Sequence, residues 1–164
     1  MKNHLYTTPT PLGPMLLLAT DQGLSGAWFV GQRHFPAQWS VSAITQQRPQ
    51  HRILANACEQ LQGYFEGRRQ RFDLPLDLSA GTVFQQAVWQ ALLRIDWGHT
   101  SSYGQLASQL GRPKASRAVG TAVGRNPISI IVPCHRVLGS QGALTGYAGG
   151  LERKQDLLTR EGVL

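Results

Sequence analysis

The first thirty residues alternate short apolar runs with turn-forming residues. Apolar and β-branched side chains gather in His4–Thr8, Met15–Ala19 and Leu24–Val30. Between these runs stand Pro9–Pro14 and Asp21–Gly23, which contain the Pro, Gly, Thr and Asp residues that turns favour. The pattern predicts antiparallel strands arranged as a hairpin or a meander.

Helical spacing replaces this pattern between Arg52 and Glu66. Apolar residues recur there every three or four positions, and Gly67 ends the predicted helix. The apolar stripe consists of Leu54, Cys58, Leu61 and Phe65. Cys58 is therefore expected to be a buried, unreactive thiol. Arg71–Leu76 is predicted as one more strand.

Strands and a helix mixed in this way predict a small α/β domain over residues 1–78, joined at Ser79-Ala80-Gly81 to a second domain over 79–164. Thr82 and Gln85 have the spacing of a capping box, which opens a helix that ends before Gly98. The apolar face of this helix consists of Phe84, Val88, Leu92 and Ile95, with Trp89 beside it as a core residue.

Two further helices are predicted at Tyr103–Leu110 and Lys114–Gly124, with Gly111-Arg112-Pro113 as a tight turn between them. A helix, a short glycine-containing turn and a second helix are the signature of a helix-turn-helix. The pattern alone is also typical of any pair of antiparallel helices.

The last of these helices has an outward face made almost entirely of small side chains. Its apolar side consists of Ala118, Val119, Ala122 and Val123, and its other side of Arg117, Gly120, Thr121 and Gly124. Glycine inside a helix costs about 1 kcal/mol relative to alanine. Two such glycines on one face indicate that something approaches the backbone closely, and a duplex groove is one candidate. The alternative is a small-residue helix packed against its own protein.

The run Ile128–Val132 is short and β-branched, which predicts a buried strand that Pro133 ends. Cys134 would then stand at a strand end, where its side chain can reach a cleft, with His135 next to it. An imidazole, positive charges or backbone N–H groups would favour the reactive thiolate. The alternative for Cys134 is a thiol packed as a small hydrophobic side chain.

Composition narrows the class of protein. The 164 residues are 41% hydrophobic and 15% charged, as in a folded globular protein. Two cysteines give no disulfide framework, the histidines have no metal-ligand spacing, and no apolar run has the length of a secretory signal or a membrane span. A cytoplasmic location is expected. The net charge of +7 favours a polyanionic partner, and nucleic acid is the better candidate.

The second half of the chain resembles the O6-alkylguanine-DNA alkyltransferases, also called methylated-DNA–protein-cysteine methyltransferases. The resemblance covers Phe84 to Glu161. No single motif within this range identifies the family, but the whole set of motifs in this order is specific to it. One departure is Asp96-Trp97-Gly98, where the family usually has proline before the glycine. The matching residues are Phe84-Gln85, Val88-Trp89, Ser102-Tyr103-Gly104, Arg117-Ala118-Val119-Gly120, Asn126-Pro127, Ile131–Val137, Gly146–Gly150, Lys154 and Glu161.

The resemblance implies an N-terminal ribonuclease-H-like α/β domain and a C-terminal helix-turn-helix, winged-helix-like domain with a short β wing. It implies binding from the minor groove, flipping of the damaged base, and irreversible transfer of the alkyl group of O6-alkylguanine to Cys134. O4-alkylthymine is a further candidate substrate. A thioether offers no easy hydrolysis step, so each molecule would react once.

The resemblance also implies roles for individual residues. Cys134 would be the nucleophile, His135 the base that takes its proton, directly or through water, and Glu161 the acid that orients the imidazole. Asn126 would tie the recognition helix to the active-site turn. Arg136 would brace that turn.

Protonation of the leaving guanine is assigned to Tyr103, with electrostatic support from Lys154, and Arg117 would fill the gap left by the flipped base. The expected DNA contacts are Tyr103, Ala115, Ser116, Arg117, Gly120, Thr121 and Ser140. The expected substrate contacts are Val137, Tyr147, Ala148, Gly149 and Gly150.

The expected partner is double-stranded DNA containing O6-alkylguanine, bound by a monomer that could cluster along the duplex, with no cofactor, no metal and no membrane. Three alternatives remain open. One is a damage binder of the alkyltransferase-like kind, in which the cysteine is replaced. The second is a helix-turn-helix regulator with Cys134 as a sensor. The third is a cysteine hydrolase, whose histidine normally lies far from the cysteine in sequence.

Overall fold

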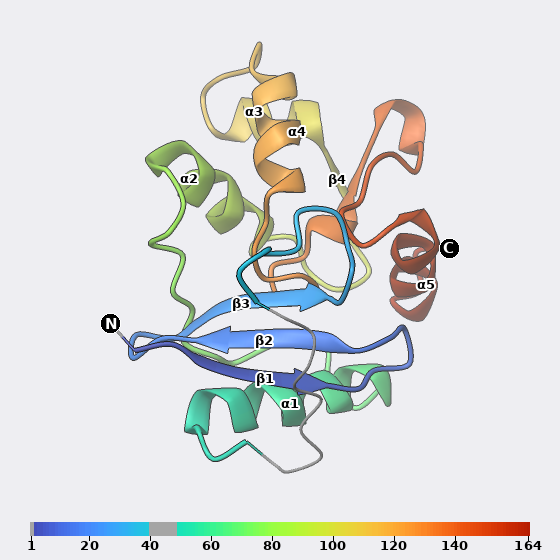
Figure 1. Ribbon diagram of the computed structural model, residues 1–164. Coiled ribbons are helices and arrows are strands. Elements are labelled where there is room, and N and C mark those ends of the chain that lie inside the picture. Colours follow the sequence, from blue (N-terminus) through green and yellow to red (C-terminus); the bar gives the residue numbers. More distant parts are fainter. Residues whose placement is uncertain (1, 40–48) are drawn as a thin grey trace. The chain divides into compact units, whose positions relative to one another are not determined.

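The computed structural model describes residues 2–39 and 49–164. The chain divides into two units, Met1–Ala80 and Gly81–Leu164. Both helices and strands are present, and the two units are described separately below (Figure 1).

The predicted meander of the first unit is confirmed. Strands β1 (His4–Thr8), β2 (Met15–Ala19) and β3 (Leu24–Phe29) form an antiparallel sheet in the order β1-β2-β3. The helix α1 (Arg52–Phe65) packs on this sheet, as Figure 1 shows. Apolar residues of the strands and of α1 form the core between them, including Met15, Leu17, Ala27, Leu54, Ala57 and Leu61.

The strand predicted at Arg71–Leu76 is wrong. Only one isolated parallel bridge forms there, between Leu24 and Leu76. Pro75 accepts a hydrogen bond from the Leu24 amide at 2.8 Å. Because proline has no N–H to donate, it cannot carry the ladder further along β3.

The second unit begins with the predicted capping box. In front of α2 (Val83–Leu92), the Gln85 amide donates to Thr82 Oγ1 at 3.1 Å and the Thr82 amide to Gln85 Oε1 at 3.0 Å. The helix ends earlier than predicted, although Ile95 beyond it is buried. Trp89 is a core residue as expected, and its indole N–H donates to the carbonyl of Ala122 at 2.8 Å.

Two short helices follow, α3 (Tyr103–Gln109) and α4 (Ser116–Gly124), joined by residues 110–115. The helix α4 starts two residues later than predicted, because a turn closes between the Ala115 amide and the Arg112 carbonyl. Val119, Ala122 and Val123 are buried as expected. Ala118 is exposed, so the buried face of α4 is narrower than the sequence pattern predicted.

The strand predicted at Ile128–Val132 is also wrong, because this segment is a turn. The Val132 amide donates back to the Ile128 carbonyl at 2.9 Å, and Ile130 adopts a positive φ of 72°. Apolar β-branched residues are buried here by folding back on themselves, which their sequence pattern does not distinguish from a strand.

The remaining elements are short except for the last. A 3₁₀ turn, η1 (Cys134–Arg136), leads into β5 (Val137–Leu138), which pairs in parallel with β4 (Ser101–Ser102). A second 3₁₀ turn, η2 (Ser140–Gly142), and the helix α5 (Leu151–Arg160) complete the unit. Across the described residues, no helix has the length and apolar character needed to cross a membrane.

Candidate active site

Cys134 is buried at the start of η1, and the strand that was expected to precede it is absent from the described structure. Burial raises the pKa of the thiol from 9.0 to about 11, against the opposing effects of a hydrogen bond from the Asn126 side chain, the positive charge of Lys154 and nearby backbone N–H groups. The resting group is therefore the neutral thiol, and not the thiolate that the sequence suggested. A base must remove its proton before it can act as a nucleophile.

His135, also buried, lies beside a carboxylate. Its Nε2 atom is 2.7 Å from Glu161 Oε2. An ionised carboxylate only accepts hydrogen bonds, so Nε2 carries the ring proton and Nδ1 has the free lone pair. Burial lowers the pKa of His135, which keeps the ring neutral. Within the described part of the chain Nδ1 is buried and has no hydrogen-bond partner.

Arg136 fixes the other side of Glu161. Its Nε donates to Glu161 Oε1 at 2.6 Å and its Nη2 to Oε2 at 3.2 Å. Its Nη1 donates to the Ile95 carbonyl at 2.5 Å. Arg136 thus braces the turn that carries Cys134, as the sequence suggested, and it offsets the charge of a carboxylate that is buried at the end of α5.

Lys154 is a buried ammonium on α5. Its Nζ donates to the carbonyl oxygens of Val137 at 2.6 Å and of Thr145 at 2.7 Å. Burial lowers its pKa from 10.5 to about 8, so the group is still mostly charged at neutral pH. Its charge acts on the thiol of Cys134. No direct hydrogen bond to Tyr103, which Lys154 was expected to support, is found in the described structure, and the two residues meet only through Thr145.

Asn126 joins the end of α4 to the turn before Cys134. Its Nδ2 donates to the Val132 carbonyl at 2.7 Å, and its Oδ1 accepts from the Ile128 amide at 2.9 Å. The same side chain hydrogen-bonds with the thiol of Cys134 and lowers its pKa. Asn126 is thus in contact with the nucleophile itself as well as with the turn.

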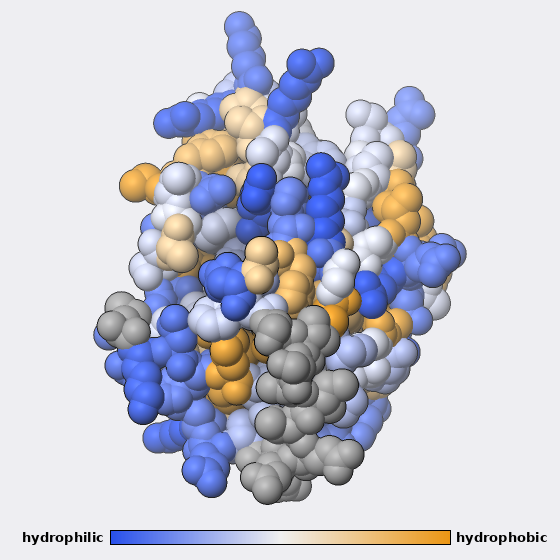
Figure 2. Space-filling model, viewed as in Figure 1, coloured by the Kyte–Doolittle hydropathy of each residue, from blue (hydrophilic) through white to orange (hydrophobic). Residues whose placement is uncertain are grey.

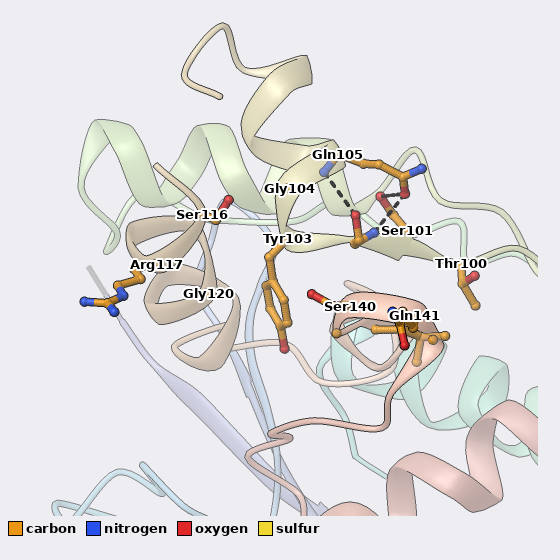
Figure 3. A pocket seen from close by; sticks show the side chains of 14 residues that line it. Thr100, Ser101, Tyr103, Gly104, Gln105, Ser116, Arg117, Gly120, Ser140 and Gln141 are labelled. Carbon is orange, nitrogen blue, oxygen red and sulfur yellow. Dashed lines mark hydrogen bonds between the residues drawn. The ribbon is translucent and has the colours of Figure 1, made fainter. Parts of the chain in front are cut away.

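A hollow of about 680 Å³ opens between α3, α4 and the η2 turn. Figure 3 shows the Tyr103 ring standing in it, with Gly120 of α4 on one side and Ser140 and Gln141 on the other. A methyl group added at Gly120 would lie 3.6 Å from the Tyr103 ring, in ordinary van der Waals contact, so the ring lies directly beside α4. The Arg117 side chain extends away from the ring, outward from α4.

The hollow brings together five of the seven predicted DNA contacts, namely Tyr103, Ser116, Arg117, Gly120 and Ser140. Ala115 and Thr121 do not line it, although both belong to the same stretch of α4 and its N-terminal end. Cys134 does not line it either. The other lining residues, which the sequence did not suggest, include Ser101, Ser102, Gln105 and Gln141.

The predicted substrate contacts lie on β5 and in the segment before α5. The Val137 carbonyl is engaged by Lys154. The Tyr147 hydroxyl is buried, and burial raises its pKa well above 10.0, so it is a neutral phenol. Ala148 is half-buried and Gly149 buried, and Gly150 has a φ of 94° at the N-terminal end of α5. The positive φ at that position favours glycine.

Two features of the site were missed in the sequence. A second capping box, Ser102 with Gln105, begins α3 and sets the direction in which Tyr103 leaves the backbone; its Ser-x-x-Gln spacing was a usable signal. Thr145 contacts both Tyr103 and Lys154. No local pattern around Thr145 marks it, because its partners are far away in the chain.

Positive charge is concentrated in the second unit. Residues 81–164 contain nine Lys and Arg against four Asp and Glu, whereas residues 1–80 contain seven against five. Arg112, Lys114, Arg117 and Arg125 are exposed on α4 and in the segments flanking it. On the face seen in Figure 2, hydrophilic side chains project from the surface over α3 and α4. Such a surface suits a polyanion.

Two family models match the chain. The model described as "6-O-methylguanine DNA methyltransferase, ribonuclease-like domain" matches residues 1–78. The model described as "6-O-methylguanine DNA methyltransferase, DNA binding domain" matches residues 83–163. Together they account for almost the whole chain.

Individual relatives agree with the models. A methylated-DNA–protein-cysteine methyltransferase of Mycobacterium tuberculosis is 46% identical over 96% of this chain and 92% of its own length. That of Salmonella typhimurium is 44% identical over 94% and 93%. Among solved structures, OGT of Mycobacterium tuberculosis in complex with DNA has a TM-score of 0.84 at 46% identity, covering 96% of this chain and 92% of that one.

Proposed function

The chain belongs to the 6-O-methylguanine DNA methyltransferases, which are DNA repair proteins, and we propose that its own Cys134 accepts the alkyl group of O6-alkylguanine in double-stranded DNA. The observation that carries the assignment is the pair His135–Glu161 beside Cys134, with the free Nδ1 of the histidine buried in the same turn. A nucleophile, a neutral base and an orienting acid are thereby gathered at one point.

The first step is removal of the thiol proton. Adjacent side chains rarely face each other, so the proton passes from Cys134 to His135 Nδ1 through a water molecule. Glu161 holds the ring with Nδ1 free and stabilises the imidazolium that forms. The developing thiolate is stabilised by the Asn126 side chain and by the Lys154 ammonium, the two groups that already lower the pKa of Cys134.

The second step is displacement at the alkyl carbon. The sulfur of Cys134 forms the new S–C bond while the C–O6 bond breaks, and the bonding electrons remain on the guanine. The Tyr103 hydroxyl gives the leaving guanine a proton or a strong hydrogen bond. The segment Tyr147–Gly150 and the backbone of Val137 line the space for the base.

DNA binding is assigned to the second unit. We assign α3 and α4 as a helix-turn-helix and the pairing of β4 with β5 as part of a short wing, with α4 at the minor groove. O6 of guanine lies in the stacked, paired duplex, so the nucleotide must leave the helix to reach sulfur, at a cost of a few kcal/mol. Arg117 fills the gap, and Ala115, Ser116, Gly120, Thr121 and Ser140 contact the backbone.

The first unit, for which we propose the boundary at residue 78, has the ribonuclease-H-like architecture. We assign no step of the reaction to it. The thiol, base, acid and proton donor all come from residues 103–161, so a single chain suffices for the reaction.

O4-alkylthymine would present the same kind of alkyl carbon and is proposed as a second substrate. A cytoplasmic location suits a reaction that needs a reduced thiol.

The test is a titration with an excess of duplex carrying O6-methylguanine. One methyl group should leave the DNA for each protein molecule, after which the reaction should stop, because the thioether has no hydrolysis route. Continued turnover would contradict the stoichiometric mechanism. Tight binding without methyl loss would favour the damage-binding alternative, and binding that ignores the lesion would favour a transcription regulator.

A further inference from the structure

Thr145 links the helix α5 to the Tyr103 hydroxyl at the start of α3. Its carbonyl oxygen accepts a hydrogen bond from Lys154 Nζ at 2.7 Å. Its Oγ1 lies 3.5 Å from the Tyr103 hydroxyl oxygen and is placed to donate to it. Because the backbone of Thr145 is held by a buried cation on α5, its side chain has little freedom to move away from Tyr103.

The side chain of Thr145 has a second close neighbour, Gly139. It packs on Gly139, where an added methyl group would lie only 2.8 Å from Thr145 Cγ2. The Gly139 amide in turn donates to the Ala143 carbonyl at 2.8 Å, which closes the loop that contains η2. The threonine methyl therefore fills a fixed place against the backbone, and this leaves its hydroxyl directed at Tyr103.

Tyr103 has few other constraints. Its ring lies beside Gly120, where an added methyl group would just touch it, and Thr145 is the one hydrogen-bond partner of its hydroxyl among the described residues. A phenol oxygen that accepts a hydrogen bond keeps its own O–H free to donate elsewhere. Hydrogen bonds in series also strengthen one another, so the accepted bond makes the phenol a better donor.

We propose that Thr145 is a positioning residue for the alkyl transfer: its hydroxyl donates to Tyr103 and thereby directs the Tyr103 O–H toward the departing guanine. The inference rests on the proposed role of Tyr103 as proton donor. The distance of 3.5 Å is long for an O–H···O bond. Hydrogen bonds in an empty site often shorten when substrate binds, and this one should do so as negative charge develops on the base.

The first test compares Thr145→Val with Thr145→Ser in single-turnover transfer from duplex DNA carrying O6-methylguanine. Valine has the shape of threonine and keeps the contact with Gly139, but it has no hydroxyl. Its rate should fall by about five- to tenfold, the effect of one hydrogen bond. Serine keeps the hydroxyl, and its rate should stay within about twofold of the parent. Equal losses in both variants would show that the methyl packing matters and would overturn the proposal.

The second test is a double-mutant cycle with Tyr103→Phe. If Thr145 acts through Tyr103, Thr145→Val should cause no further loss in the Tyr103→Phe protein. The same five- to tenfold loss in both backgrounds would assign Thr145 a purely structural role. A normal rate for Thr145→Val, with a slow Tyr103→Phe, would overturn the proposal and leave Tyr103 as the donor. A normal rate of methyl transfer to Cys134 in the Tyr103→Phe protein would overturn both the role of Thr145 and the role of Tyr103 as proton donor. It would leave Cys134 as the methyl acceptor.

Discussion

The two cysteines of the chain share one physical property and differ in another. Cys58 on α1 is half-buried, more exposed than the sequence suggested, and Cys134 in η1 is buried. Burial raises the pKa of both thiols, because a thiolate loses more hydration than a thiol. By this criterion the buried Cys134 should be the less reactive of the two.

The groups around the two thiols differ, although burial still leaves the pKa of Cys134 raised. The only effect that lowers the pKa of Cys58 is a hydrogen bond with the Thr8 side chain. Around Cys134 the Asn126 amide, the Lys154 ammonium and backbone N–H groups all lower the pKa, and the next residue, His135, is paired with Glu161. On this basis we expect the groups arranged around the thiolate, more than the exposure of the sulfur, to decide which cysteine reacts.

The acidic residues repeat this contrast. Glu66, at the end of α1, pairs with Arg68 at 2.6 Å, and both side chains are exposed to solvent. Glu161, at the end of α5, pairs with both His135 and Arg136 inside the protein. The first pair is screened by water, whereas the second holds the site together.

The largest expected effect separates the two thiols. Cys134→Ala should lower the rate of methyl removal from DNA by about 10³-fold or more, because the nucleophile is gone. Cys58→Ala, its matched control, should keep the parent rate. Methyl remaining in a defined oligonucleotide is the measurement. Comparable losses in the two variants would remove the distinction drawn here between the cysteines.

The next effect separates the two glutamates. Glu161→Gln should lower the free energy of unfolding by roughly 3–5 kcal/mol, since it leaves the Arg136 charge buried without its counter-ion. It should also slow transfer, because an amide N–H donating to His135 Nε2 would force the ring proton onto Nδ1. Urea unfolding and single-turnover kinetics measure the two effects.

Glu66→Gln is the control for Glu161→Gln. It removes a solvent-exposed partner of Arg68 and should change neither stability nor rate measurably. A Glu161→Gln protein as stable as the Glu66→Gln protein would show that the buried pair does not hold the turn.

A smaller effect concerns pH. The unfolded thiol loses its proton near pH 9 and the folded Cys134 thiol near pH 11, so the unfolded state holds fewer protons between these values. Stability present below pH 9 is therefore lost as the pH rises to 11, by about 3 kcal/mol. Lys154, with its pKa lowered to about 8, acts in the opposite direction between pH 8 and 10.5.

The comparison of parent and Cys134→Ala removes the contribution of Lys154 apart from the part of its pKa that depends on the charge of Cys134, because both proteins contain the lysine. The parent should lose more stability than Cys134→Ala between pH 9 and 11, and Cys58→Ala should follow the parent more closely. Parallel curves for parent and Cys134→Ala would mean that burial does not raise the pKa of Cys134.

The smallest effect in this comparison concerns one arginine from each unit, Arg117 in the second and Arg68 in the first. Arg117→Ala should reduce repair of duplex DNA by about tenfold, the size expected for one arginine contact with DNA. Its reaction with free O6-benzylguanine should be near normal, because no base must be extruded. Arg68→Ala, on the first unit, should change neither reaction. Equal losses for Arg117→Ala on both substrates would indicate a structural role.

Much of the fold followed from short-range patterns. The meander and α1 follow from the spacing of apolar residues, and the start of α2 follows from the Thr82–Gln85 capping box. Each of these signals depends on residues within a few positions of one another. The segment Ile128–Val132 was predicted wrongly because its fold depends on Asn126 and on burial in the tertiary structure.

The site divides in the same way. Cys134 and His135 are adjacent, and their pairing was visible in the sequence. Glu161 lies 26 residues from His135, and its role followed only from resemblance to a family until the structure placed the two in contact. Thr145 could not be found, because one residue links Tyr103, 42 positions before it, with Lys154, nine positions after it.

The central claim is that the buried thiol of Cys134, and not the half-buried thiol of Cys58, receives the alkyl group. The most direct measurement is peptide mapping by mass spectrometry after reaction with duplex DNA carrying O6-methylguanine. We predict one added methyl mass on the peptide that contains Cys134 and none on the peptide that contains Cys58. A methyl group on Cys58, or DNA repaired with both peptides unchanged, would contradict the account.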